Sequence, residues 1–309
     1  MEYTYDLIII GGGPAGTAAG VYAARKRLKT LLLADSFGGQ SVVSAEIQNW
    51  IGTVAISGED LATSLKEHVE AYAGDVLTIK EERAQKLEQH EGTFTLTTDK
   101  GSHTSRAVLI TTGSHRRKLE AINADKFEHK GLTYCASCDG PLFAGQDLAV
   151  IGGGNAAFES AAQLLAYARS VTIIHRGEDF FRADPITVDK VLTNPKIRAV
   201  RNAVILEIKG DAFVTGLVYK DSKTGATTEL PIGGIFIEIG QLPNTEFVKD
   251  VVALNEMSQI IIDPRTQQTH TKGVWAAGDC TDVLYHQNNI AAGDAVRALE
   301  DIYKTLHTK

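Results

Sequence analysis

The sequence predicts an α/β protein with two doubly wound domains, each carrying a small antiparallel β insertion. Two observations predict this class. A strand, a glycine turn, a helix and a second strand follow one another twice, with the turns beginning at Gly11 and Gly152. Each unit is followed by short segments in which apolar and polar residues alternate, interrupted by glycine. This pattern is typical of antiparallel strands. With 309 residues and 43% hydrophobic content, the chain is long enough to form two cores.

The first unit begins with the β-branched, apolar segment 5–10, which predicts a buried strand that ends at glycine. The Ala-rich segment 14–26 predicts the helix, and 30–33 the next strand. An antiparallel hairpin is expected over 76–98, and 107–111 should return as a buried strand.

The second unit repeats this order, with a strand at 148–151, a helix over about 156–169 and a strand at 171–174. An antiparallel insertion is expected over 203–230, with Gly216 and Gly225 as turn points. Further along the chain, the segments 234–240 and 273–279 are each expected to contain a strand that ends at glycine. A long helix is expected at 288–303. Since no low-complexity linker is present, any domain boundary should be a pair of ordered crossings near Gly113 and Pro243.

Composition excludes several classes of protein. A net charge of -7 and a pI near 5.7 argue against a nucleic-acid binder, and we interpret the basic run 116–118 as a solvated loop edge. Residues 7–24 carry no charge, but Pro14 and five glycines within them indicate a turn and a helix rather than a membrane span or signal. With three cysteines and no export signal, we expect a cytoplasmic protein that does not bind membranes.

Cys135 and Cys138 form the sequence's Cys-x-x-Cys motif, and they lie between the two glycine turns. A zinc site would need two more closely spaced ligands, and no second Cys-x-x-Cys or His-x-x-x-His accompanies the pair. We therefore expect no metal. The two-residue spacer allows the thiols to close a small disulfide ring, which favours a redox role. Two dinucleotide turns and one dithiol together indicate an electron relay.

The order of motifs along the chain resembles that of the low-molecular-weight thioredoxin reductases, and the resemblance covers essentially the whole sequence. It rests on Cys135-Ala136-Ser137-Cys138-Asp139-Gly140, Ala276-Ala277-Gly278-Asp279, Gly38-Gly39-Gln40, Asn49-Trp50, Thr112-Gly113 and Ile239-Gly240. The segments 140–143 and 278–287 are also similar to the flavoprotein subunit of alkyl hydroperoxide reductase. That relative has an extra N-terminal dithiol domain, which we do not expect in this protein.

The resemblance implies a discontinuous FAD-binding domain, 1–113 and 244–309, and an NAD(P)H-binding domain, 114–243, that carries the cysteines. Both would be Rossmann-like. It also implies a homodimer, a role in cell redox homeostasis, and thioredoxin or another small dithiol redoxin as the partner.

In the FAD domain, the first glycine turn would hold the pyrophosphate at a helix N-terminus, through Gly11, Gly13, Pro14, Ala15 and Gly16. The family's ribose-binding acid falls on Ala34, so we assign this role to Asp35, one position later. The resemblance gives further contacts with the nucleotides to Gly39, Gln40, Asn49, Thr112, Gly113, Ile239, Gly240, Gly278, Asp279 and Gln287.

His286 stands where the family usually has arginine. A titratable imidazole in place of a permanent cation could alter the flavin potential or its pH dependence, and a structural, surface-exposed role is the alternative. The helix that follows is expected to place its N-terminus near the flavin, where its dipole would stabilise the reduced, anionic form.

The second glycine turn would hold the pyrophosphate of the nicotinamide dinucleotide, through Gly152, Gly154, Asn155, Ala156 and Ala157. His175 and Arg176 stand where an NAD-selective site would have an acid, and Arg182 resembles the later arginine of the NADPH pattern. We therefore expect NADPH, with NADH possible. The family's second consecutive arginine is Gly177 here, the loop is one residue longer, and Glu178 and Asp179 could repel the phosphate or simply be solvated.

By family position, Cys138 should be the thiol that receives electrons from the flavin, and Cys135 the thiol that attacks the partner's disulfide. Asp139 would move the protons, with capping of the next turn as its alternative role. Cys280 should be a small buried apolar residue.

The sequence thus predicts an NADPH-dependent thioredoxin-disulfide reductase. Alternatives are a ferredoxin-fed or NADH-fed disulfide reductase that serves a peroxiredoxin system, and a dithiol oxidase that uses oxygen. A non-enzymatic flavin-binding sensor or scaffold would not require the dithiol and both dinucleotide sites together.

Overall fold

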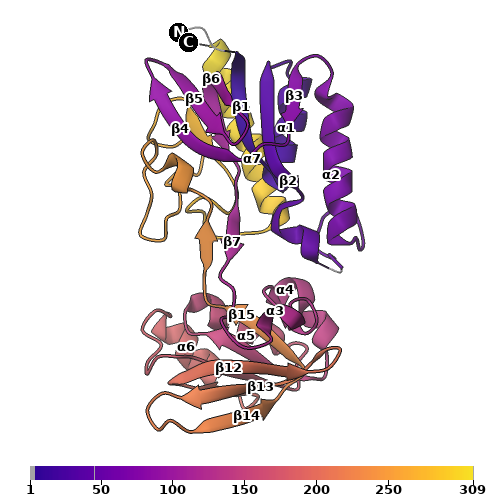
Figure 1. Ribbon diagram of the computed structural model, residues 1–309, viewed down its shortest axis with the longest axis vertical. Coiled ribbons are helices and arrows are strands. Elements are labelled where there is room, and N and C mark those ends of the chain that lie inside the picture. The colour runs from indigo at the N-terminus through magenta and orange to yellow at the C-terminus, as the bar shows by residue number, and fades with distance from the viewer. Residues whose placement is uncertain (1–3, 45, 309) are drawn as a thin grey trace. The chain divides into compact units, whose positions relative to one another are not determined.

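The computed structural model describes residues 4–44 and 46–308 (Figure 1). The chain divides into two compact units. The first combines Met1–His115 with Leu242–Lys309, and the second is Arg116–Gln241. Within the described residues, no helix combines the length and the apolar character that crossing a membrane would require.

The first unit is built on one mixed sheet, in the order β3-β2-β1-β6-β5-β4, with β17 paired to β6. Its strands are β1 (Tyr5–Gly12), β2 (Thr30–Phe37), β3 (Leu77–Lys80), β4 (Ala84–His90), β5 (Thr93–Thr98), β6 (Ser102–Ile110) and β17 (Val274–Ala276). The strands β3, β2, β1, β6 and β17 run parallel, while β4 and β5 form the antiparallel hairpin. The expected hairpin 76–98 was therefore too long: buried Leu77 pairs with Thr30, and this places β3 in the parallel part.

Three helices cover one face of this sheet, α1 (Pro14–Arg25), α2 (Gly58–Ala73) and α7 (Asn288–His307). Their buried side chains pack with those of the sheet, including Leu7, Leu109 and Trp275. The opposite face of the sheet packs against Val248, Val252 and Ile260. Two short 3-10 helices, η1 (Gly39–Val43) and η3 (Glu246–Val248), complete the unit. Helix α7 runs four residues beyond the expected end at Tyr303.

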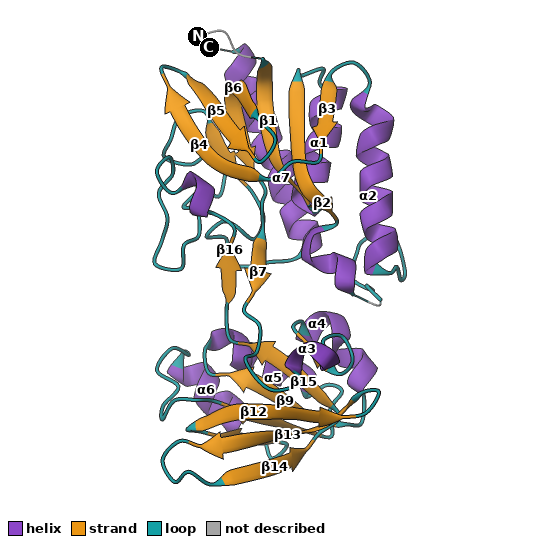
Figure 2. Cartoon of the chain, in the orientation of Figure 1, coloured by secondary structure: helices purple, strands orange, loops and turns teal. Residues whose placement is uncertain are grey.

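The second unit has three layers (Figure 2). A parallel sheet, in the order β11-β10-β9-β15-β8, lies between α5 and an antiparallel sheet of β12, β13 and β14. The parallel strands are β8 (Leu132–Thr133), β9 (Asp147–Gly152), β10 (Ser170–Ile174), β11 (Ile197–Val200) and β15 (Gly234–Glu238). The others are β12 (Ala203–Gly210), β13 (Val214–Asp221) and β14 (Thr227–Pro231), with helices α3 (Ala124–Phe127), α4 (Ala136–Asp139), η2 (Gly140–Phe143), α5 (Asn155–Leu164) and α6 (Pro185–Leu192).

Two local predictions in this unit were wrong. Gly216 lies inside β13, paired with Pro231, and is not a turn point. Helix α5 ends at Leu164 rather than near Arg169, because the backbone tightens there: the amide of Tyr167 donates to the carbonyl of Leu164.

The chain crosses between the units twice, and the crossings pair as a two-stranded sheet of β7 (Ser114–Arg116) and β16 (Gln241–Pro243) (Figure 2). Next to this sheet, in the first unit, Thr112 and Asn244 bond each other reciprocally. The Thr112 hydroxyl donates to the Asn244 carbonyl at 2.8 Å, and the Asn244 amide donates to the Thr112 carbonyl at 2.9 Å. The predicted fold class is confirmed: two doubly wound halves, each with an antiparallel addition.

Candidate functional site

The first glycine turn joins β1 to α1 with very little space around it. If Gly16 were replaced by alanine, the added Cβ atom would lie 1.8 Å from the carbonyl oxygen of Gly11. A Cβ atom added to Gly11 would lie 2.3 Å from the carbonyl oxygen of Thr111. Gly13, the N-cap of α1, has more space: a Cβ atom added there would have its nearest neighbour, the Gly39 Cα, at 3.8 Å. The backbone of this turn can thus be approached closely from outside at Gly13, while Gly11 and Gly16 allow the helix to pack on the strand.

Helix α1 begins without a side-chain cap and without an acidic residue in its first turn. In contrast, the N-terminus of α2 is capped by Ser57, whose Oγ accepts from the Asp60 amide. Free N–H groups at a helix start favour an anion, so the start of α1 fits a dinucleotide pyrophosphate. Pro14 and Ala15 are buried at this start, Ala34 is buried against Gly12, and Asp35 is exposed at the end of β2.

Polar residues from distant parts of the sequence converge beyond this turn. The Gln40 amide donates to Asp279 Oδ2 at 3.3 Å and to the hydroxyl of Ser114 at 3.1 Å. The Asn49 amide donates to Gln287 Oε1 at 3.1 Å. Of the residues predicted to contact FAD, the fold brings these four together in two pairs. Sequence reasoning missed Ser114, which no motif marked.

Two predicted glycines frame the same region. Gly278 has φ +78°, and a Cβ there would lie 3.2 Å from the Ala291 Cβ of α7 and 3.5 Å from that of Ala15 in α1. Gly39 has φ +61° and lies beside Gly13. These close approaches hold the starts of α1 and α7 near each other. Gly113 also has a positive φ, +61°, but nothing lies within 4 Å of its Cβ position.

His286 precedes α7 and is half-buried. Its Nε2 atom is buried with no hydrogen-bond partner among the described residues. An orphaned ring nitrogen next to an N-cap, Gln287, without a capping side chain fits a polar group of a bound cofactor. His286 is thus partly shielded from solvent, and its role at the flavin stays a prediction.

Cys280 is fully buried, as expected, and its thiol donates to the Ile110 and Ala277 carbonyls. Burial raises its pKa to about 11, so it stays a neutral thiol and is a poor nucleophile.

The second glycine turn repeats this construction between β9 and α5. A Cβ on Gly152 would lie 2.3 Å from the Glu238 carbonyl oxygen, while Gly154 has open space around its Cβ position. Helix α5 also begins without a side-chain cap or an early acidic residue, whereas Asp184 caps α6. Asn155 instead holds the next loop, because its Oδ1 accepts from the Asp184 amide at 2.7 Å. Ala156 is exposed and Ala157 is buried against the sheet.

His175 fills the space under this turn. A Cβ on Gly153 would lie 2.2 Å from His175 Nδ1, and the ring lies 5.2 Å from that of Phe180, centroid to centroid. Burial lowers the pKa of His175 below its ordinary value, and the nearby Arg176 and Arg201 add to this effect. The imidazole is therefore neutral at pH 7, and the positive charge here comes from arginines.

Three exposed arginines lie near this turn. Arg176 follows His175, Arg182 pairs its backbone with Gly154, and the Arg201 guanidinium lies 4.8 Å from the Phe180 ring centroid. Sequence reasoning did not identify Arg201, which comes from the turn after β11. Glu178, expected to repel a phosphate or be solvated, is exposed and forms an ion pair with Lys223. That pairing offsets one of the two acidic charges of this loop.

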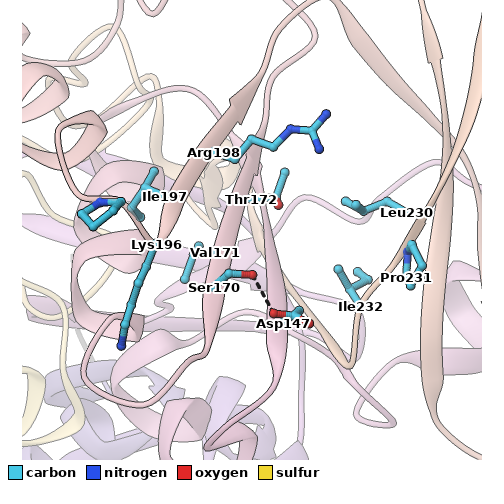
Figure 3. A pocket seen from close by; sticks show the side chains of 11 residues that line it. Asp147, Ser170, Val171, Thr172, Lys196, Ile197, Arg198, Leu230, Pro231 and Ile232 are labelled. Carbon is cyan, nitrogen blue, oxygen red and sulfur yellow. Dashed lines mark hydrogen bonds between the residues drawn. The ribbon is translucent and has the colours of Figure 1, made fainter.

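A pocket of about 360 Å³ also lies in this unit (Figure 3). It is lined by Asp147, Ser170 and Ile197, which begin β9, β10 and β11, and by Pro231 and Ile232. These are the amino ends of the parallel strands, whereas the glycine turn follows the carboxyl end of β9. The pocket is therefore not the dinucleotide site, which belongs at the carboxyl ends.

Cys135 and Cys138 are joined by a disulfide at the start of α4. The Cys138 amide donates to Cys135 Sγ at 3.2 Å. Asp139 follows immediately, and its carboxylate accepts from the Thr133 hydroxyl rather than capping the next turn. Burial raises the pKa of Asp139 above its ordinary value, against the opposing effects of Thr133, His129 and Arg116. Within residues 4–44 and 46–308, no cluster of metal-ligating side chains was found.

The pyridine nucleotide-disulphide oxidoreductase family matches residues 5–296. This chain belongs to that family. Membership implies FAD and a pyridine nucleotide as cofactors, and both uncapped glycine turns fit such groups. The predicted oxidoreductase class is thereby confirmed.

Solved structures of thioredoxin reductases match the whole chain. The enzyme from Streptococcus pyogenes MGAS5005 is 34% identical, with a TM-score of 0.90 over 99% of both chains. That from Giardia duodenalis is 31% identical, with a TM-score of 0.92 over 100% of both. This is a thioredoxin-reductase-like fold, as the motifs predicted.

Curated relatives have other names. An alkyl hydroperoxide reductase subunit of Escherichia coli (strain K12) is 40% identical over 299 residues, and an NADH dehydrogenase of Bacillus subtilis (strain 168) is 39% identical over 295. Each match covers 95% of this chain but 57% of the relative. The chain thus spans a little over half the length of these proteins, and they do not establish its electron donor or acceptor.

Proposed function

We propose that this protein is a flavoprotein disulfide reductase that passes electrons from NADPH through FAD to the Cys135–Cys138 disulfide and on to thioredoxin or a similar small redoxin. Net, NADPH and a proton reduce one partner disulfide to two thiols, with release of NADP⁺. The observation that carries the proposal is the Cys135–Cys138 disulfide, which the partly buried carboxyl group of Asp139 follows directly. The same unit contains the glycine turn before α5, a helix that begins without a side-chain cap.

The first unit would hold FAD and the second would hold NADPH. FAD, when bound, supplies the exchange between two-electron donors and disulfides. The start of α1 would bind its pyrophosphate, with Gln40, Asp279, Asn49 and Gln287 positioned around the rest. In the second unit, the start of α5 would bind the nucleotide's pyrophosphate.

The cysteines would have different roles. Cys135 would attack the partner disulfide as a thiolate, and Cys138 would then displace the partner and close the Cys135–Cys138 bond again. Each partner thiolate that leaves needs a proton. Asp139 can hold one, because burial raises the pKa of its carboxyl group, while the Thr133 hydroxyl fixes its orientation.

Anaerobic reduction tests this proposal most directly. The purified, oxidised holoprotein is mixed with NADPH or, separately, with NADH, and flavin bleaching and free thiols are followed. We expect NADPH to bleach the flavin and to produce about two new thiols per chain, one from each cysteine of the pair. Bleaching without new thiols would contradict the relay. Failure with both nucleotides would contradict the assignment of the second unit and favour ferredoxin or a dithiol as the donor.

Arg176 should determine the preference for NADPH. We expect Arg176→Ala to lower kcat/KM for NADPH about ten- to a hundredfold, since a charge-assisted bond to the 2′-phosphate contributes about 1.5–3 kcal/mol. Activity with NADH should change little. The matched control is Arg198→Ala, which removes an exposed arginine of β11 that lines the pocket of Figure 3. Equal losses with both nucleotides in Arg176→Ala would argue against a 2′-phosphate contact.

An NADH-fed reductase that serves a peroxiredoxin system is the second candidate. It is favoured by the relatives that are named as alkyl hydroperoxide reductase subunits. Peroxide consumption in the presence of a peroxiredoxin, with and without an added redoxin carrier, separates the two functions. The homodimer stays a prediction, which sedimentation of the purified protein would test.

A further inference from the structure

Glu238 is the last residue of β15 and lies directly opposite the second glycine turn. It pairs in register with Gly152, the last residue of β9. The two backbones are so close that a Cβ on Gly152 would lie 2.3 Å from the Glu238 carbonyl oxygen. Glu238 belongs to no sequence motif, whereas Ile239 and Gly240, immediately after it, are part of the family pattern.

The protein forms a hydrogen bond with one carboxylate oxygen of Glu238 and leaves the other without a partner among the described residues. Its Oε1 accepts from the hydroxyl of Ser160 in α5 at 2.6 Å. Its Oε2 has no hydrogen-bond partner in the described part of the chain and is not a fully enclosed atom. One carboxylate oxygen is thus fixed by the protein, while the other remains accessible to a ligand.

Glu238 titrates near neutrality. Burial raises its pKa to about 7, in spite of the opposing effects of the Ser160 hydrogen bond and of Arg116 in β7. The negative charge of Glu159 on α5 also raises the pKa of Glu238. A charged ligand placed beside Oε2 would therefore change the protonation of this carboxyl group within the physiological pH range.

The sheet order indicates which part of a dinucleotide would approach Glu238. The order is β10-β9-β15, so the pyrophosphate turn after β9 has β10 on one side and β15 on the other. Arg176, the candidate for the 2′-phosphate of the adenosine half, follows β10. If the adenosine half lies over the end of β10, the nicotinamide half must lie over the end of β15, where Glu238 stands.

We propose that Glu238 is a positioning residue for the nicotinamide half of the nucleotide, whose ionised carboxylate stabilises the positively charged, oxidised ring more than the neutral, reduced ring. This inference rests on the proposed function of the second unit. The carboxylate attracts the pyridinium of NADP⁺ and accepts a hydrogen bond from the nicotinamide half through Oε2. Protonation removes this attraction.

The pH dependence has a defined sign. NADP⁺ favours the ionised form, so its binding lowers the pKa of Glu238 and releases protons near pH 7. The affinity for NADP⁺ should therefore be highest above about pH 7 and fall as the carboxyl group becomes protonated. The affinity for a fragment of the nucleotide that lacks nicotinamide should not depend on the protonation of Glu238.

The test is calorimetric titration of the oxidised holoenzyme with NADP⁺ and with 2′-phospho-ADP-ribose, at about pH 6 and about pH 8. The fragment carries the same titratable 2′-phosphate, so the difference between the two ligands isolates the nicotinamide half. In the wild type, we expect NADP⁺ to gain about tenfold in affinity over the fragment between these pH values, the equivalent of one charge-assisted interaction. In Glu238→Gln, whose amide can still accept from Ser160, that gain should vanish.

Two control variants separate this role from a structural one. Ser160→Ala removes a bond that lowers the pKa, so the midpoint of the NADP⁺ pH profile should move upward while the profile persists. Glu229→Gln, which neutralises an exposed carboxylate of β14, should leave the profile unchanged.

The outcomes also separate the two proposals. Wild-type pH dependence in Glu238→Gln, with normal fragment binding, would overturn the role of Glu238 alone. If neither NADP⁺ nor the fragment binds the wild type, the nucleotide site of the second unit is wrong, and the role of Glu238 is wrong with it.

Discussion

Cys138→Ser should abolish reduction of a protein disulfide, with a loss of at least about a thousandfold in turnover, while NADPH still bleaches the flavin. The reason is that the variant cannot close the Cys135–Cys138 disulfide, which would link the flavin to the partner. Hydride transfer from NADPH would not involve either sulfur. The measurements are anaerobic flavin bleaching and steady-state reduction of thioredoxin, in the same preparation.

A trapping experiment distinguishes the two cysteines. The partner is a thioredoxin with one cysteine replaced and the other activated with a thionitrobenzoate leaving group. In Cys138→Ser, the Cys135 thiolate should displace this group and remain linked to the partner, because no neighbouring thiol resolves the bond. Cys135→Ser should trap far less. Cys280→Ala, which removes only a buried thiol, should behave like the wild type. Full turnover of Cys138→Ser with thioredoxin would contradict the assignment.

Gly16→Ala should prevent FAD from binding. The added Cβ would lie 1.8 Å from the Gly11 carbonyl oxygen, so α1 must move away from β1 or the turn must open. Overpacking of this kind costs about 1–3 kcal/mol, and here the cost falls on the backbone groups expected to hold the pyrophosphate. We expect protein purified from cells to contain little FAD and its affinity for added FAD to fall at least about tenfold.

The matched control is Gly293→Ala. Gly293 lies inside α7, and nothing stands within 4 Å of its Cβ position. Alanine is favoured over glycine in a helix interior by about 1 kcal/mol, so this variant should retain FAD and melt at a higher temperature. FAD absorbance per chain and thermal unfolding measure both effects. A Gly16→Ala protein that retains full FAD would show that the turn does not contact the cofactor.

Strands and helices were predictable where the pattern of hydrophobic residues was strong. The segments around both glycine turns became β1, α1 and β2, and β9, α5 and β10, because buried apolar runs followed by glycine and a helix allow few other structures. Errors arose where long-range pairing decides the outcome. Leu77 follows a hairpin-like pattern but pairs with Thr30. Gly216 is a turn residue by type but lies in a paired strand.

Parts of the candidate site could be predicted in the same way. The cysteine pair and the glycines are motifs of fixed spacing, and the structure joins the cysteines in a disulfide and places the glycines in two tight turns. Ser114, Arg201 and Glu238 belong to no motif, and they matter only because the fold brings them beside Gln40, His175 and Gly152.

The sequence by itself determined the fold class, the family and the redox motif, because these depend on residue types at short spacing. Only the tertiary structure decided which charges and hydrogen bonds surround that chemistry. Glu178 is neutralised by Lys223, His175 is kept neutral by burial, and Glu238 titrates near neutrality. The first result depends on a partner distant in sequence and the other two depend on desolvation, and both arise only when the chain folds.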